Sequence, residues 1–259
     1  MGNMVRLRPN AKINLGLFIK GRLPNGYHTL ETLLYPLKQL CDIIEIEEDT
    51  GGDCSLDISG LEIEGSHRNN LCYRAWAIMK KIFPDLPGVS IRLEKHIPMG
   101  AGLGGGSSDA AFTMIGLNRL FDLGLNLDEL ARLSRPLGAD VPFFVYNRPL
   151  LASGIGQDFE EVSLALPYRI ELVTPPIHSS TVAAYKALDY TMFDGGRDLR
   201  SVLCLPIRDW RTHLENDLEV PVFQLHPEIR SYKMALYEQG ALYASMSGSG
   251  SAVFGIFDA

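Results

Sequence analysis

The sequence of 259 residues predicts an α+β fold in two domains. Patterns typical of strands and of helices follow one another without the regular strand–helix repeat of a doubly wound parallel sheet. Hydrophobic residues make up 46% and charged residues 21%, a composition typical of globular proteins that excludes a disordered or fibrous chain. Pro149 and several glycines cluster between residues 148 and 160. This cluster places the predicted boundary between domains 1–155 and 156–259.

The first hundred residues carry mostly strand patterns. Residues 5–20 are rich in Leu, Ile and Phe and predict one or two strands, while PNGYH at 24–28 has the chemistry of a tight turn. Apolar residues recur at helical spacing from Asn70 until Pro84, which predicts one helix between them. Further half-buried strands are predicted where apolar and polar residues alternate, at 40–47, 55–63 and 89–97.

After the third of these strands the chain has a glycine-rich segment and then a predicted helix of small residues. Asn126 and Glu129 have the spacing of a capping box, which predicts a short helix that Gly138 ends. The apolar stretch 141–146 follows. The remaining predicted elements are a strand at 168–174, helices at 181–188 and 227–239, and a final strand–MSGSGS–strand. In the last helix, Ile229, Tyr232 and Leu236 are expected to be buried.

Charge and motif content exclude several classes of function. The net charge is −7 and the pI is about 5.4, which argues against a nucleic-acid-binding protein. The four cysteines show no CxxC spacing, the opening MGNMVRLRPN has no apolar signal region, and no apolar run reaches transmembrane length. We therefore expect a soluble cytoplasmic protein with no membrane partner. The six histidines show no metal-ligand spacing, so we predict no protein-built metal centre.

The glycine-rich segment is the clearest functional feature. Five glycines lie within seven positions, at Gly100, Gly102, Gly104, Gly105 and Gly106. A flexible linker is not needed between a strand and the helix that directly follows it. The N-terminus of a helix offers backbone N–H groups to an anion, and absent side chains let phosphate oxygens approach. The segment therefore predicts a phosphate-binding loop. It fits neither a dinucleotide fold nor a GxxxxGK[ST] P-loop, and the protein-kinase HRD and DFG motifs are absent.

A phosphotransferase also needs a cation, an oriented nucleophile and Mg²⁺. Lys12 lies in an otherwise apolar strand, where a lysine is rare without a partner, although it could also be an edge residue that reaches solvent. Asn14 points to the same face of that strand. Asp140 in LGADVPFF is the acidic candidate, and a local cap is its ordinary alternative. Ser107 or Ser108 could offer a hydroxyl to Mg²⁺.

Six ordered motifs, taken together, are similar to the GHMP small-molecule kinases: AKINLGL, PNGYHTLETL, PMGAGLGGGSSDAA, LGADVPFF, NDLE and MSGSGS. The resemblance implies a two-domain fold that binds ATP, Mg²⁺ and substrate in the cleft between the domains. Within this family, the motifs most resemble members that phosphorylate a hydroxyl of a cytidine-diphosphate-linked methylerythritol, in the non-mevalonate route to isoprenoid precursors. The resemblance leaves both a monomer and a homodimer open.

The resemblance also implies roles for particular residues. The catalytic pair would be Lys12 and Asp140. Substrate would bind at Asn14, Tyr27, His28, Thr181 and Tyr185, with the cytosine between Tyr27 and Tyr185. ATP would contact Asn70, Lys95 and the phosphate loop, which comprises Pro98, Met99, Gly100, Ala101, Gly102, Leu103, Gly104, Gly105, Gly106, Ser107 and Ser108. The alternatives are a GHMP kinase for homoserine, mevalonate or a sugar, and a nucleotide-binding module without catalysis.

Overall fold

A computed structural model describes residues 3–63, 65–189 and 196–258. It divides the chain into two compact units, each described here by itself. Unit 1 comprises residues 1–12, 36–99 and 104–148, and unit 2 comprises residues 13–35, 100–103 and 149–259. The predicted domains are two continuous ranges that meet at 155/156, and this boundary stays a prediction. The compact units differ from it by assigning three segments of the predicted first domain, residues 13–35, 100–103 and 149–155, to unit 2.

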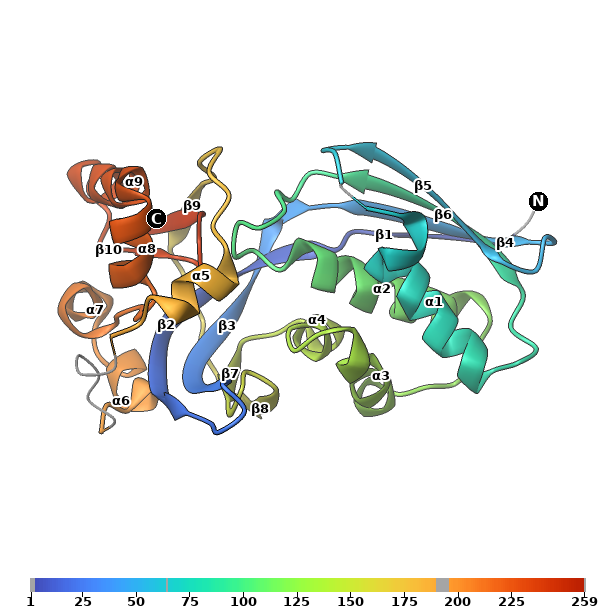
Figure 1. Ribbon diagram of the computed structural model, residues 1–259, viewed down its shortest axis with the longest axis horizontal. Helices are drawn as coiled ribbons and strands as arrows, with labels where there is room; N and C mark the ends of the chain where they lie inside the picture. The colour runs from blue at the N-terminus through green and yellow to red at the C-terminus, as the bar shows by residue number, and fades with distance from the viewer. Residues whose placement is uncertain (1–2, 64, 190–195, 259) are drawn as a thin grey trace. The chain divides into compact units, whose positions relative to one another are not determined.

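Unit 1 is built on a four-stranded sheet with the order β1-β4-β6-β5. Only the β5–β6 pair is parallel among its described pairs. Helices α1 and α2 pack against the sheet, and α3 and α4 lie beyond α2 (Figure 1). The bounds are β1 Met4–Leu7, β4 Ile43–Asp49, β5 Cys54–Gly60, β6 Gly88–Lys95, α1 Leu71–Ile82, α2 Gly105–Leu120, α3 Leu127–Ser134 and α4 Val141–Tyr146. Two 3₁₀ turns, η1 His67–Asn69 and η2 Arg135–Leu137, precede α1 and α4.

Unit 2 contains an antiparallel sheet with the order β10-β11-β9, against which α9 packs. Its elements are β7 Leu150–Ser153, β8 Asp158–Glu161, β9 Arg169–Val173, α5 Thr181–Lys186, α6 Leu199–Leu203, α7 Ile207–His213, α8 Glu219–Leu225, α9 Pro227–Glu238, β10 Tyr243–Met246 and β11 Val253–Phe257. A further sheet has the order β2-β3-β7-β8, in which β2 is Asn10–Arg22 and β3 is His28–Cys41. The unit boundary falls within both β2 and β3.

Local chemistry explains why the main helices begin and end where predicted. Asn70 caps α1 by accepting a hydrogen bond from the Cys72 N–H, and the reciprocal bonds of the capping box between Asn126 and Glu129 open α3.

One burial prediction in α9 is wrong: Ile229 and Leu236 are buried, but Tyr232 is 39% exposed. It lies about 60° around the helix from Ile229, at the edge of a narrower buried stripe.

No helix within the described residues is long and apolar enough to cross a membrane.

Candidate active site

The phosphate-binding candidate begins where β6 ends and leads into α2. Gly104 is the N-cap of α2 and has a φ of 71°, in the left-handed region that favours glycine. A Cβ at Gly104 would lie 2.8 Å from the Phe144 ring and 3.2 Å from Lys12 Cγ. The backbone at the start of α2 therefore packs closely against the stem of Lys12, which only glycine permits.

The start of α2 has the features of an anion site. The Ser108 N–H donates to the Gly104 carbonyl at 2.9 Å, so the amides of Gly105, Gly106 and Ser107 precede the first hydrogen bond within the helix. Helix geometry directs such amides outward along the positive end of the helix dipole. Gly106 is exposed and Ser107 half-buried, whereas Ser108 is fully buried. Of the two predicted serines, only Ser107 is therefore placed to offer its hydroxyl to a ligand.

Residues 100–103 pack within unit 2 against residues 247–252, the C-terminal loop between β10 and β11. The Ser247 hydroxyl donates to the Gly102 carbonyl at 2.8 Å, and the Ala252 N–H donates to the Ala101 carbonyl at 3.1 Å. Gly102 has a φ of 75°, and a Cβ there would collide with the Ser247 carbonyl oxygen. Ser247 of the MSGSGS motif and Ala252, which follows that motif, thus support this half of the glycine loop.

Lys12 and Asp140 meet in unit 1. Lys12 Nζ lies 3.8 Å from Asp140 Oδ2, and the side chains are 5% and 37% exposed. Asp140 is the N-cap residue of α4, but its side chain makes no capping hydrogen bond. Burial lowers the pKa of Lys12, and the nearby Asp140 carboxylate partly opposes this shift. The pair therefore joins a desolvated ammonium to a solvent-accessible carboxylate beside the N-cap of α2.

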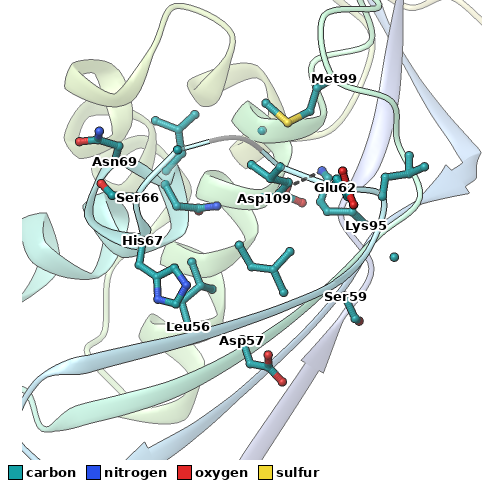
Figure 2. Close-up of a pocket in the computed structure, with 18 residues that line it drawn as sticks. Leu56, Asp57, Ser59, Glu62, Ser66, His67, Asn69, Lys95, Met99 and Asp109 are labelled. Atoms are coloured by element: carbon teal, nitrogen blue, oxygen red, sulfur yellow. Dashed lines mark hydrogen bonds and ion pairs between the residues drawn. The ribbon is translucent and has the colours of Figure 1, made fainter. Parts of the chain in front are cut away.

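A pocket of about 550 Å³ adjoins the start of α2 in unit 1 (Figure 2). Apolar side chains line part of it, and Asn70, Lys95, Met99 and Gly106 contribute to its wall. The Asn70 side-chain oxygen is engaged in capping α1 at 2.8 Å from the Cys72 nitrogen. Two of the predicted ATP contacts, Asn70 and Lys95, are therefore brought together with the helix start.

Sequence reasoning missed the surroundings of Lys95. Its ammonium is 1% exposed and forms ion pairs with Asp42 and, at 2.7 Å, with Asp109. Asp42 follows a strand with no functional motif around it, and Asp109, the residue after the two serines, was assigned no role. The signal available was the Lys itself, since a lysine in a buried strand position requires an acidic partner.

A second pocket, of about 570 Å³, lies in unit 2. Tyr27, His28, Thr181 and Tyr185 all line it, so the structure brings these four predicted substrate residues together. The His28 and Tyr185 rings stack with centroids 4.8 Å apart and planes 29° apart, while Tyr27 is 61% exposed. Burial lowers the pKa of His28, and the cationic Arg22 lowers it further. The neutral imidazole is thus favoured near pH 7.

The fifth predicted substrate residue, Asn14, is buried rather than in this pocket. Its Nδ2 donates to the Thr32 hydroxyl at 3.0 Å, and the Ser247 hydroxyl lies 3.5 Å from its Oδ1. The NDLE motif has a bracing role that sequence reasoning did not assign. Asn216 Nδ2 donates to the carbonyls of Met246 and Gly248, at 2.9 and 2.8 Å, and so holds the C-terminal loop in place.

Two protein-family models match parts of this chain. The model of the GHMP kinases N terminal domain matches residues 70–148, and that of the GHMP kinases C terminal matches residues 207–259. A 4-diphosphocytidyl-2-C-methyl-D-erythritol kinase of Azobacteroides pseudotrichonymphae is 45% identical over 250 residues, which cover 96% of this chain and 92% of that relative. The chain belongs to the GHMP kinase family. The predicted α+β fold and the resemblance to this family are confirmed.

Other GHMP kinases extend the comparison. The kinase of the same name from Porphyromonas gingivalis is 44% identical over 96% of this chain and 90% of its own length. Among solved structures, a 4-(cytidine 5'-diphospho)-2C-methyl-D-erythritol kinase gives a TM-score of 0.83 at 36% identity, covering 97% of this chain and 90% of that chain. The Methanococcus jannaschii mevalonate kinase gives 0.72 at 14% identity, covering 100% and 91%, a likeness of fold alone.

The donor set of this GHMP kinase bears on how it could hold a metal. Within residues 3–63, 65–189 and 196–258, no three His, Cys, Asp or Glu side chains gather as a metal site would require. Mg²⁺ in phosphoryl-transfer sites is commonly held by substrate phosphates and water with one or two protein oxygens. The half-buried Ser107 hydroxyl at the start of α2 fits that sparse arrangement.

Proposed function

We propose that this protein transfers a phosphoryl group from ATP to a hydroxyl of 4-diphosphocytidyl-2-C-methyl-D-erythritol. Relatives with this kinase name align along almost the whole chain, and seven of them are 42–45% identical to it. The observation that carries the catalytic proposal is the Lys12–Asp140 pair beside the N-cap of α2. That arrangement supplies an acid–base group next to a phosphate-binding helix.

Asp140 would orient the acceptor hydroxyl and take its proton as the new bond to phosphorus forms. Its side chain is free of any capping bond in α4, so the carboxylate can turn toward a ligand. Lys12 would orient Asp140 and offset the charge that develops on the transferred phosphoryl group. The first amides of α2 would bind the phosphates of ATP. A positioned base and an electrostatic clamp of this kind each contribute roughly 10²–10⁴ in rate.

The pocket beside α2 would take the nucleoside of ATP. Its apolar wall suits a flat base, and Gly106 lies both in that wall and in the first turn of α2. The first turn of α2 would thus contact both the base and the phosphates of ATP. Ser107 would supply an oxygen to Mg²⁺, which would neutralise phosphate charge when bound.

The pocket in unit 2 would bind the cytidine group. A flat base stacks on aromatic faces such as those of Tyr27 and Tyr185. Neutral His28 has one ring N–H donor and one acceptor nitrogen, either of which would form a single hydrogen bond to the edge of a cytosine. Thr181 lies at the start of α5, and its hydroxyl is 2.8 Å from the Ser249 hydroxyl, so the C-terminal loop helps to place it.

The direct test is the Asp140→Asn variant. The amide keeps the size of the side chain but cannot accept the proton of the acceptor, so we expect kcat to fall by about 10³-fold. The dissociation constant for ATP should change by less than about threefold, because the phosphates would bind to α2. Turnover is measured as ADP release with the cytidylyl substrate. Unchanged kcat would remove Asp140 from the mechanism.

Substrate choice separates the alternatives within and outside the family. The same ADP-release assay, run with homoserine, mevalonate, galactose and the cytidylyl substrate, should show turnover only with the last. Comparable turnover of mevalonate or galactose would overturn the substrate assignment. ATP binding without turnover of any acceptor would indicate a nucleotide-binding module.

A further inference from the structure

Three ionisable side chains are buried together beneath the start of α2. Lys95 at the end of β6 is 1% exposed, Asp42 in the turn before β4 is 0% exposed, and Asp109 in α2 is 3% exposed. The Lys95 ammonium contacts both carboxylates, Asp109 through its Oδ2 at 2.7 Å. A Cβ at Gly105 would lie 3.3 Å from this ammonium, so the cluster packs directly under the first turn of α2.

The hydrogen bonds decide which carboxyl group carries a negative charge. Asp42 accepts from Lys95 and from the backbone N–H groups of His96 and Ile97, at 2.6 and 2.8 Å. These three donors pair the Asp42 carboxylate with the charge of Lys95. A second negative charge on Asp109 would be buried without compensation, which is unfavourable. The cluster therefore favours the protonated form of Asp109.

The geometry bears on which oxygen carries that proton. Lys95 can only donate, so Asp109 Oδ2 acts as an acceptor toward it. Burial raises the pKa of Asp109 to about 8, against the lowering effect of Lys95 and with raising contributions from the charge of Asp42 and from a side-chain hydrogen bond to Asp42. Oδ1 is buried and has no hydrogen-bond partner among the described residues. Asp109 lines the pocket beside α2, and Figure 2 shows its side chain meeting Lys95 there.

Other ionisable groups also face Asp109 or line the pocket. Cys72 of α1 faces it, but burial raises the pKa of this thiol far above neutral pH, and Asp109 raises it further. The pocket is also lined by Asp57, Glu62 and His67, from β5 and from the segment that leads to α1. The facing helix α4 presents only buried apolar residues from Val141 to Val145.

We propose that Asp109 recognises the nucleoside of ATP as a neutral carboxyl group, its Oδ1–H donating a hydrogen bond to an acceptor nitrogen of the purine ring. Lys95 is then a positioning residue that holds Asp109 and does not bind nucleotide charge itself. This inference rests on the proposed function, because it requires ATP to bind in this pocket. The apolar wall of the pocket favours the base as the part of ATP that carries the acceptor atom. A ribose oxygen is the alternative acceptor, and the experiment distinguishes the two.

The Asp109→Asn variant gives the sharpest test. Lys95 will draw the amide oxygen, so the NH₂ group faces the pocket and reproduces the donor of a protonated Asp109. We expect this variant to keep the KM for ATP within about twofold at pH 7. In the wild type, kcat/KM for ATP should fall as pH rises through about 8, where Asp109 loses its proton. In Asp109→Asn that fall should be absent.

Deaza analogues of ATP locate the acceptor. For the wild type and for Asp109→Asn, one of 1-deaza-, 3-deaza- and 7-deaza-ATP should raise KM roughly tenfold, the effect of one lost hydrogen bond. Asp109→Leu keeps Lys95 paired one-to-one with Asp42 and removes the donor. This variant should have a KM for ATP about tenfold above that of the wild type. Its KM for that analogue should equal its KM for ATP. The Asp85→Asn variant, an exposed carboxylate elsewhere in unit 1, is the matched control and should behave as wild type throughout.

Several outcomes would overturn the inference while leaving the kinase activity in place. Equal KM for ATP and all three analogues, with 2'-deoxy-ATP alone impaired, would assign the acceptor to the ribose. A KM for Asp109→Asn raised as much as that of Asp109→Leu would show that Asp109 acts only by packing. If Asp109→Leu does not fold, the pH profile and analogue series of Asp109→Asn still decide. Absence of wild-type turnover with ATP would instead refute the proposed function.

Discussion

At the scale of single residues, Lys12 shows how a functional charge is held at a cost in stability. The ammonium is almost entirely buried, and its neighbour Asp140 stands 3.8 Å away, too far for a tight hydrogen bond. Burial lowers the pKa of Lys12 below its ordinary value of 10.5 because desolvation outweighs the attraction of Asp140. A charge kept under these conditions is explained by what it does to a ligand.

We expect Lys12→Met to be more stable and nearly inactive. Methionine has a similar stem and no charge to desolvate, so the free energy of unfolding at pH 7 should rise by about 1 kcal/mol. The lowered pKa sets the pH dependence. The penalty is complete below the folded-state pKa of Lys12 and disappears as pH rises toward 10.5, so the stability gap should narrow in alkaline buffer.

Urea unfolding at pH 7 and pH 10 measures this gap, and ADP release should show kcat at least about 100-fold lower. The Lys81→Met variant, at an exposed position in the last turn of α1, is the control for loss of a surface lysine. A Lys12→Met protein that is both less stable and fully active would contradict the account of Lys12 as a desolvated functional cation.

Sequence reasoning at this scale succeeded where residue type and motif coincide, as with Lys12 and Asp140, which the structure places together. It could not anticipate that two carboxyl groups contact Lys95. Asp42 lies 53 positions away from Lys95, and only the antiparallel pairing of β4 with β6 brings the two together. Pairings at that sequence distance leave no local pattern.

At the scale of elements, the glycine loop has two kinds of constraint. Gly102 combines a φ of 75° with a backbone neighbour, the Ser247 carbonyl, that leaves no space for a Cβ. Gly124 has nearly the same φ, 71°, but its Cβ would meet nothing within 4 Å. The two positions therefore separate conformational strain from steric collision.

We expect Gly124→Ala to lower Tm by about 2–4 °C, the effect of roughly 1 kcal/mol of left-handed strain on a chain of this size. Gly102→Ala should lower Tm at least twice as much, because the Ser247 backbone must also shift. It should in addition raise the KM for ATP, while Gly124→Ala leaves that KM unchanged. Equal Tm shifts for the two variants in a thermal melt would show that the loop adapts to a Cβ at residue 102.

Elements with periodic patterns or caps were predictable, and elements without them were not. The helix after Asn70 followed from the helical spacing of its apolar residues, and the helix after Asn126 followed from its capping box. Residues 141–146 were predicted only as an apolar stretch, because α4 is buried on all sides from Val141 to Val145 and so shows no helical period. Helices α6, α7 and α8 have five to seven residues, too few for a period to be counted.

At the scale of the whole molecule, the chain order hides how the units are assembled. Residues 13–35 lie near the N-terminus yet belong to unit 2, where the Ile19 N–H donates to Asp217 at 2.7 Å and the Leu17 N–H donates to the Glu215 carbonyl at 2.9 Å. Contacts nearly 200 residues apart depend on folding of the complete chain. Composition changes along the sequence mark a boundary between domains but do not show such an exchange of segments.

The division also assigns the two proposed ligand sites to different units, and this predicts separable effects on binding. The pocket beside α2, proposed here for the nucleotide, is lined entirely by residues of unit 1. The pocket that contains Tyr27 and Tyr185, proposed for the cytidine group, is lined entirely by residues of unit 2. In Gly106→Ala the new Cβ approaches only Leu71, at 3.6 Å, so α2 should not be destabilised, but the methyl group narrows the nucleotide pocket. In Tyr185→Leu the aromatic face that would stack on the cytosine is lost.

Steady-state kinetics with each substrate varied in turn should therefore show a crossed pattern. Gly106→Ala should raise the KM for ATP about tenfold and leave the KM for the cytidylyl substrate within twofold, whereas Tyr185→Leu should do the reverse, since one stacked base contributes roughly 1–3 kcal/mol. Val182→Ala serves as the control for Tyr185, because it trims an exposed side chain of the same helix without removing an aromatic face. If Gly106→Ala and Tyr185→Leu both raise the KM of both substrates, the assignment of one ligand to each unit is wrong.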